Sequence, residues 1–212
     1  MDIVKLHNLA LGHYSKGMHL EAIEVLNQVI KANTRLAEAY FNRGMIRGTV
    51  GDYEGEIEDY NQALRLNFNH IDLHYNLGAA YYSLKDYENA IKELEKVLKE
   101  DPLYIDAHDT LGLVYAAKEF FQIAIEHYSN ALRINSTRSV TRIFRCIAHL
   151  KLGDFQAATK DINILNKQQQ VIADEPMFYV ARSLYRYHNQ YHQGVIEDSN
   201  RVRVTFLVEK LG

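Results

Sequence analysis

The sequence contains very little cysteine and proline and no tryptophan. Cys146 is the one cysteine among 212 residues. No disulfide can therefore form within the chain, and a reducing compartment, the cytoplasm, is expected. Two prolines leave little room for disordered linkers between domains. These scarcities favour a continuously folded chain.

The sequence also lacks an excess of basic residues and a long apolar run. It has 24 Lys and Arg against 27 Asp and Glu, for a net charge of −3, so nucleic-acid binding is not expected. No apolar stretch approaches the length of a membrane span, so we do not expect the chain to insert into a membrane. Residues 1–8 lack the charged head and apolar core of a signal peptide. At 47% hydrophobic and 24% charged residues, the composition fits a soluble folded protein.

The most informative stretch is residues 71–104, where small, apolar and turn-forming residues stand at helical spacings. They are Leu77, Gly78, Tyr81, Ala90, Leu94, Val97 and Pro102. The spacing predicts two helices, with Lys85 and Asp86 in the turn and Asp86 as the N-cap of the second. Gly78 and Ala90 are small because the two helices are expected to cross closely there. Pro102 should end the second helix.

This stretch resembles a tetratricopeptide repeat, which has Leu-Gly, Tyr, Ala and Pro at these positions. Copies of it occupy residues 3–36, 37–70, 105–138 and 139–172, and residues 173–212 are expected to form a degenerate sixth unit with a capping helix. The resemblance implies one all-α domain over residues 1–212. Its architecture would be a right-handed superhelical solenoid of antiparallel helix pairs with a concave groove.

Two copies depart from the repeat pattern at positions that normally pack. In residues 37–70, Arg43 replaces the usual leucine, Arg47 the tyrosine and Glu56 the small residue. These changes predict either looser packing or arginine stems that lie across the apolar surface with their charged heads in water. Cys146 stands where the motif has glycine, and is expected to be a small core residue.

No constellation of residues indicates an enzyme or a cofactor. The chain has no phosphate-binding glycine loop, paired-cysteine metal site or nucleophile elbow. His70 and His74, and likewise His188 and His192, are four residues apart, but neither pair has a third ligand at a convincing spacing. We expect no metal and no cofactor. His74 and His108 share a repeat position, which predicts that both lie where repeats pack together.

The resemblance also implies which residues face the groove. The sixth position of four successive repeats holds Asn8, Asn42, Asn76 and Thr110. An asparagine amide offers both a donor and an acceptor, so it can bind a peptide backbone whatever the peptide's side chains are. The alternative is that asparagine is simply common at this position of the motif.

The second position of the repeats also faces the groove and carries acids. It holds Val4, Glu38, Asp72 and Asp106. Tetratricopeptide co-chaperones clamp a terminal carboxylate with lysines and an arginine, which this chain lacks at the matching places. An acidic groove would favour a ligand with lysine or arginine. Alternatively, these acids suit the first turn of a helix, where the helix dipole favours negative charge.

Aromatic residues accompany the asparagines. Phe41, Tyr75 and Tyr82 are expected along the same surface and could form pockets for apolar side chains of a bound segment. The alternative is that such residues cover neighbouring helices of the protein itself.

Two functions remain open. The first is a protein-interaction module or adaptor that binds a peptide segment of a partner, possibly basic, in the concave groove. The second is an assembly component that self-associates or docks through its convex or C-terminal surface. A cap left incomplete at Val204–Leu211 would favour homo-oligomers through the C-terminal helices.

Overall fold

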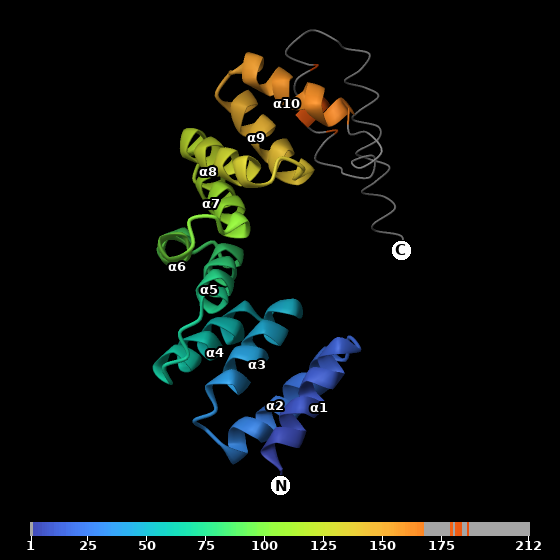
Figure 1. The fold of residues 1–212 in the computed structure, drawn as a ribbon, viewed down its shortest axis with the longest axis vertical. Coiled ribbons are helices and arrows are strands. Elements are labelled where there is room, and N and C mark those ends of the chain that lie inside the picture. The colour runs from blue at the N-terminus through green and yellow to red at the C-terminus, as the bar shows by residue number, and fades with distance from the viewer. Residues whose placement is uncertain (1, 168–178, 180, 184–185, 187–212) are drawn as a thin grey trace. The chain divides into compact units, whose positions relative to one another are not determined.

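The structure, a computed structural model, describes residues 2–167, 179, 181–183 and 186. Over residues 2–167 the secondary structure is entirely helical, and the helices follow one another in antiparallel pairs (Figure 1). They are α1 (Ile3–Ser15), α2 (His19–Ala32), α3 (Ala37–Thr49), α4 (Tyr53–Arg65), α5 (Ile71–Ser83), α6 (Tyr87–Glu100), α7 (Ile105–Ala117), α8 (Phe121–Ile134), α9 (Ser139–Lys151) and α10 (Phe155–Lys167). This arrangement confirms the predicted all-α class. The expected sixth unit and its cap at Val204–Leu211 fall almost wholly outside the described residues.

The turn within each pair is built in the same way. Each turn has one residue with a positive φ, and these residues stand at the same position of successive repeats: Gly17, Gly51, Lys85, Glu119 and Gly153. A left-handed residue after the last helical turn satisfies the carbonyls that the helix leaves unbonded. The predicted cap is confirmed, because the Asp86 side chain accepts a hydrogen bond from the Asn89 N–H at 3.2 Å.

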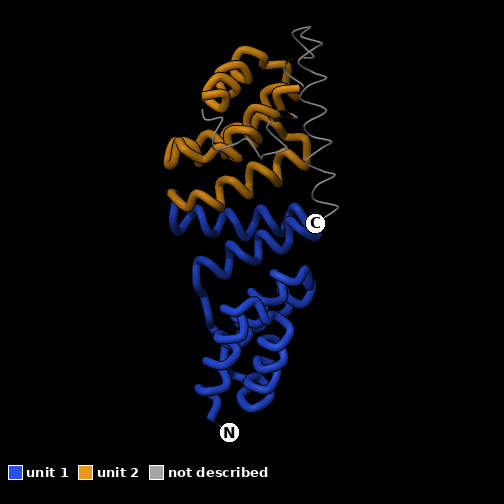
Figure 2. Tube along the Cα trace, turned by 90° about the vertical axis from the view of Figure 1, so that its right-hand side faces the viewer, with its two compact units in different colours: residues 1–102 blue, residues 103–212 orange. Residues whose placement is uncertain are grey.

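The chain divides into two compact units, residues 1–102 and residues 103–212 (Figure 2). Unit 1 contains α1–α6 and unit 2 contains α7–α10. In unit 2, Cys146 is completely buried beside Ile143 and Ile162, which confirms its prediction as a core residue. Burial raises the pKa of its thiol to about 12, so the thiol is unreactive at neutral pH.

Glycine allows the two helices of a pair to approach closely. A Cβ added to Gly78 would lie 2.7 Å from Leu94 Cγ and 3.4 Å from the Ala90 carbonyl oxygen. This confirms the predicted crossing of α5 and α6. A Cβ added to Gly112 would overlap the ring of Tyr128, which is 1% exposed.

We therefore expect Gly112→Ala to lower the free energy of unfolding by about 1–3 kcal/mol, because the buried Tyr128 ring has little room to move. Urea denaturation followed by circular dichroism measures this. Gly12→Ala is the matched control, since Gly12 lies within α1 with no atom within 4 Å of the added Cβ. That change should stabilise the protein by about 0.5–1 kcal/mol. Equal effects of the two changes would contradict the packing argument.

No described helix is both long enough and apolar enough to cross a membrane.

Candidate functional site

The asparagines of unit 1 differ in how far their side chains are exposed and in the contacts that their amides make within the protein. Asn8 on α1 is exposed, whereas Asn42 on α3 and Asn76 on α5 are half-buried. Asn42 Nδ2 lies 2.8 Å from His7 Nε2, and this hydrogen bond joins α3 to α1. The side chain of Asn76 lies near the buried hydroxyl of Tyr60 from α4, but no hydrogen bond of normal geometry joins them. Asn42 therefore uses part of its amide to contact the preceding repeat.

The acidic residues of the second position are not equivalent either. Glu38 is exposed in the first turn of α3 and makes no ion pair with any described residue. Asp72 Oδ2 lies 3.3 Å from His70 Nδ1, and the Asp72 side chain is half-exposed. Both acids also stand in first turns, so they interact favourably with their helix dipoles as well. Glu38 and Asp72 are thus the acids of unit 1 that can meet a ligand.

In unit 2 the corresponding acid is paired. Arg138 Nη2 lies 2.8 Å from Asp106 Oδ1 and 2.7 Å from Asp109 Oδ2. Thr110 is 8% exposed, and its hydroxyl donates to the Asp106 carbonyl oxygen within α7. The charge of Asp106 is therefore paired although its side chain is 52% exposed, and Thr110 presents little surface to a ligand.

The aromatic residues of this surface contact the protein's own helices. The Phe41 ring packs against Phe68 and Tyr60, with ring centroids 5.1 and 5.8 Å apart. Tyr82 lies against Tyr87 at 6.2 Å. For Phe41 this favours the alternative that the ring covers neighbouring helices. Tyr75, like Phe41 and Tyr82, is half-buried.

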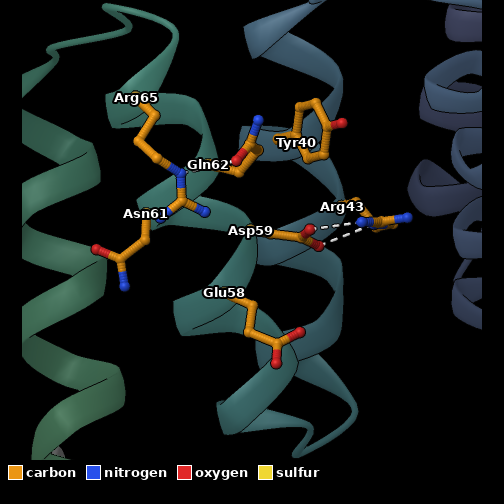
Figure 3. Close-up of a pocket in the computed structure, with 7 residues that line it drawn as sticks. All are labelled: Tyr40, Arg43, Glu58, Asp59, Asn61, Gln62 and Arg65. Carbon is orange, nitrogen blue, oxygen red and sulfur yellow. Dashed lines mark hydrogen bonds and ion pairs between the residues drawn. The ribbon is translucent and has the colours of Figure 1, made fainter. Parts of the chain in front are cut away.

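Arg43 and Arg47 do not extend their heads into water, so that prediction is wrong. Both bind Asp59 on α4, a residue that is 2% exposed, and Figure 3 shows the contact made by Arg43. Arg43 donates from Nε and Nη2 at 2.8 and 2.6 Å, and Arg47 from Nη1 at 3.0 Å. Arg43 Nη1 also donates to Asn27 Oδ1 on α2 at 2.7 Å. A buried carboxylate needs such partners, and this need draws the guanidinium groups inward.

The same cluster recurs in unit 2, three repeats later. Arg145 donates to Asp161 from Nε and Nη2 at 2.9 and 2.6 Å, and to Ser129 Oγ on α8 at 3.1 Å. Arg142 Nη1 lies 3.4 Å from the same carboxylate. The sequence signal that could have found both clusters is an Arg in the first helix of a repeat together with an Asp in the second, at matching repeat positions.

A cleft of about 610 Å³ borders the cluster in unit 1. Its lining is Tyr40, Arg43, Glu58, Asp59, Asn61, Gln62 and Arg65, all from α3 and α4 (Figure 3). Two arginines and two carboxylates balance in charge, and Arg43 is already bound to Asp59. The cleft therefore shows no preference for a charged ligand.

The histidines at the fourth repeat position bond within their own helix pairs, and His74 also bonds to the preceding repeat as predicted, because its Nε2 lies 2.7 Å from Asn69 Oδ1. His74 on α5 contacts Glu93 Oε2 on α6 at 2.7 Å. His108 Nδ1 on α7 lies 3.2 Å from His127 Nδ1 on α8. Burial, together with His108, lowers the pKa of His127 to about 4, so it is neutral at physiological pH.

Two pairs of histidines, each with a spacing of four residues, were the candidates considered when no metal site was predicted. In one pair, His70 accepts a hydrogen bond from the Asp72 N–H at 3.3 Å as the cap of α5, while His74 is bound to Glu93. His188 and His192 lie outside the described residues. Across the part of the chain that is described, no group of three or more His, Cys, Asp or Glu could hold a metal ion.

Glu56 is a buried carboxyl group at the position where the motif has a small residue. It is 7% exposed, and a Cβ added to Gly48 would lie 2.5 Å from its Oε2. The missing side chain of Gly48 thus makes room for this carboxyl group. Burial, with a smaller contribution from Asp52, raises its pKa from 4.5 to about 7.

Comparison with known proteins supports the repeat assignment. Residues 71–104 match the family described as Tetratricopeptide repeat, and residues 50–85 match the one described as TPR repeat. No curated protein sequence matches the chain.

Solved structures share the fold at low sequence identity. "MamA 41-end from Desulfovibrio magneticus RS-1" has a TM-score of 0.76 and 22% identity, over 81% of this chain and 97% of its own. A tetratricopeptide repeat protein from Parabacteroides merdae ATCC 43184 has a TM-score of 0.80 and 19% identity, over 96% and 79%. YrrB, described as "a TPR protein with an unusual peptide-binding site", has a TM-score of 0.71 and 16% identity, over 85% and 92%.

These matches agree with the helix pairs that both units contain. The first helix of each pair begins at the same position of its repeat, at Ile3, Ala37, Ile71, Ile105 and Ser139. This fold is typical of scaffolds that bind other proteins and carry no catalytic centre. With family matches over residues 50–104 and the same fold in the solved structures, the chain contains tetratricopeptide repeats and has the fold of the solved tetratricopeptide repeat structures.

Proposed function

We propose that this chain is an adaptor that binds an extended segment of a partner protein. The proposed binding face lies on the first helices of the repeats of unit 1 and carries Asn8, Asn42, Glu38 and Asp72. The observation that carries the proposal is the exposed acid Glu38, which has no ion-pair partner among the described residues and lies one helical turn before Asn42 on α3. An amide can donate to and accept from a peptide backbone. The carboxylate of Glu38 adds a preference for particular side chains of the partner.

The charge of this face favours a basic segment. Asp72 lies one repeat after Glu38 at the same repeat position, and no lysine or arginine of the described residues pairs with Glu38. A lysine or arginine of the ligand would meet two carboxylates, whereas a terminal carboxylate would be repelled. Asp106, at the same repeat position in unit 2, is already bound by Arg138 and is not part of the proposed face.

Selection from a random peptide library against the intact chain tests the proposal. We expect the selected peptides to be enriched in lysine and arginine, and the enrichment to disappear in the double variant Glu38→Gln, Asp72→Asn. Each rim charge should change affinity by about 0.5–1 kcal/mol, or about threefold.

Glu58→Gln combined with Glu95→Gln is the matched control. It removes the same charge from two exposed positions on the second helices α4 and α6. Equal loss of basic enrichment in the control would show that net charge alone attracts the peptides. Absence of any enriched sequence would contradict the adaptor function.

A second function, assembly with other copies, has its own observation. Leu9 on α1 is 49% exposed and Leu20 on α2 is 71% exposed. Leu9 occupies the repeat position at which Arg43 reaches the preceding helix pair. A mass that rises with concentration in sedimentation, and falls again in Leu20→Glu, would favour this function over the adaptor.

A further inference from the structure

Gly48 interrupts a row of tyrosines on the first helices of unit 1. It lies two helical turns after Phe41, which itself follows Glu38 by three residues, so the three lie along one face of α3. The same repeat position holds Tyr14 in the first repeat and Tyr82 in the third. Gly48 has no side chain, and it therefore leaves a gap beside the proposed binding face where its neighbours have an aromatic ring.

The carboxyl group of Glu56 occupies this gap. Glu56 belongs to α4, the second helix of the pair, yet a Cβ added to Gly48 would lie 2.5 Å from its Oε2 and 2.6 Å from its Oε1. Both distances are shorter than a van der Waals contact. The carboxyl group thus stands where a side chain of residue 48 would begin, and it faces the same side of α3 as Glu38.

Glu56 is peculiar to the second repeat. The same repeat position holds Ala22, Ala90, Ala124 and Ala158 in the other four described repeats, and all four are completely buried. Glu56 is 7% exposed, so an acid has been inserted at an apolar place. Burying a charge there opposes folding, and sequences break such packing rules mostly at functional sites.

No described lysine, arginine or histidine makes an ion pair with Glu56. On α3, Arg47 is bound instead to Asp59 at 3.0 Å and to Asp52 at 3.4 Å. A largely buried carboxylate without a counter-ion is costly, and a cation that reaches it removes part of that cost. The second repeat therefore holds a carboxylate that a cation from outside the protein can neutralise.

We propose that Gly48 and Glu56 form a subsite of the binding face that receives the ammonium group of a lysine of the partner segment. An ammonium on an unbranched stem is narrower than the guanidinium fork of arginine, so it suits a gap one side chain wide. The exposed Glu38 attracts any basic residue, whereas the largely buried Glu56 selects lysine at one position of the segment. The subsite deepens the proposed adaptor function, and its biological role rests on that function.

Protons compete with lysine for Glu56. Burial, with a smaller contribution from Asp52, raises the pKa of Glu56 to about 7. Only the ionised carboxylate attracts an ammonium group, so affinity should rise as pH rises through about 7. Tyr60, the other titratable group beside Glu56 on α4, stays neutral because burial raises its pKa.

The titratable groups on the other elements packed nearby have partners of their own. On α5, His74 is bound to Glu93 of α6. On α2, His19 Nδ1 lies 3.5 Å from Thr49 Oγ1 at the end of α3. Any effect of these histidines on affinity remains in a variant that changes Glu56 alone.

Titration with n-butylammonium, which copies the end of a lysine side chain, tests the subsite. The backbone amide of Gly48 is followed by ¹⁵N NMR of the full chain at about pH 8 and an ionic strength of about 0.15 M. We expect a saturable shift of the Gly48 signal. Glu56→Gln should weaken binding by about tenfold or more, because it removes the buried carboxylate. Lowering the pH to about 6 should weaken wild-type binding by about tenfold.

Glu54→Gln is the matched control, because Glu54 is an exposed acid in the same first turn of α4. It should change the affinity by about threefold or less. The uncharged n-butanol should leave the Gly48 signal in place, and n-propylguanidinium should bind more weakly than n-butylammonium.

A Gly48 amide that does not respond to n-butylammonium, or that responds equally in Glu56→Gln, would overturn the subsite. Tighter binding of n-propylguanidinium would overturn its assignment to lysine. No peptide is used, so a failed peptide selection leaves this result intact. Likewise, a failed subsite leaves the adaptor function untouched.

Discussion

Glu56→Gln is expected to raise the free energy of unfolding at about pH 8 by about 2–3 kcal/mol. In the wild type, the folded state holds the carboxyl group in a buried place where its pKa is about 7, against an ordinary value of 4.5. Ionising it there costs about 1.4 kcal/mol for each unit of that difference. Glutamine has nearly the same shape and carries no charge, so the cost disappears.

The free energy of unfolding of the wild type should depend on pH, and the raised pKa of Glu56 determines the direction of that dependence. Because the pKa is higher in the folded state, the folded state binds the proton more tightly than the unfolded state does. Wild-type stability should therefore fall as pH rises from about 4.5 to about 7, and then level off. The contribution of Glu56 to this fall should be absent in Glu56→Gln. Urea denaturation at about pH 5 and about pH 8 measures the difference between the two proteins.

Glu54→Gln is the matched control for this experiment. Glu54 lies in the same first turn of α4 but is exposed. Its replacement should change stability by no more than about 0.5 kcal/mol at either pH. A Glu56→Gln protein that is less stable than the wild type at both pH values would show that the ionised carboxylate is a stabilising partner in the fold.

Asp59→Ala is expected to lower the free energy of unfolding by about 3–5 kcal/mol. The carboxylate is 2% exposed and accepts hydrogen bonds from Arg43 and Arg47. Its removal leaves the half-buried Arg43 guanidinium without a counter-ion. The loss should therefore exceed that of an exposed ion pair by several-fold.

Arg43→Leu combined with Asp59→Val should cost much less than Asp59→Ala alone. The double variant copies the first repeat, which has Leu9 and Val25 at the same two positions. Removing both charges leaves no unpaired guanidinium at position 43, and apolar residues can fill the space. A double-mutant cycle of Arg43→Leu and Asp59→Val, measured by urea denaturation, gives the coupling energy.

Lys5→Ala is the control for the ion-pair cycle. The Lys5–Asp2 pair is exposed on both sides, so its loss should change stability by less than about 1 kcal/mol. Additive effects of the two cycle substitutions would show that the buried pair carries no energy of its own. The equivalent pair Arg145 and Asp161 of unit 2 should behave like the pair in unit 1.

The helix pairs could be predicted because their determinants are local or lie at a fixed repeat distance. Asp86 caps the helix that begins at the next residue. Gly78 and Ala90 are small where α5 and α6 cross, and the helix pairs return at a regular interval along the chain. The buried place of Cys146 followed from its repeat position alone. Short-range hydrogen bonding and helical periodicity determine these features.

The candidate site was predicted less completely, because its contacts join residues of different helices. The amide of Asn42 meets His7, which is 35 residues away in the chain. The heads of Arg43 and Arg47 bind Asp59 on another helix. Repeat position predicts the face on which a side chain lies, but not the partner that its polar end finds.

By itself, the sequence determined that this chain forms consecutive helix pairs with asparagines and acids at repeating positions. Only the tertiary structure decided which of those groups are engaged and which can meet a ligand. In the folded protein, Arg138 binds Asp106, Glu38 remains exposed, and Glu56 is buried against Gly48. The physical reason is that burial and ionic partners depend on the packing of neighbouring helices, whereas helix formation depends on nearby residues.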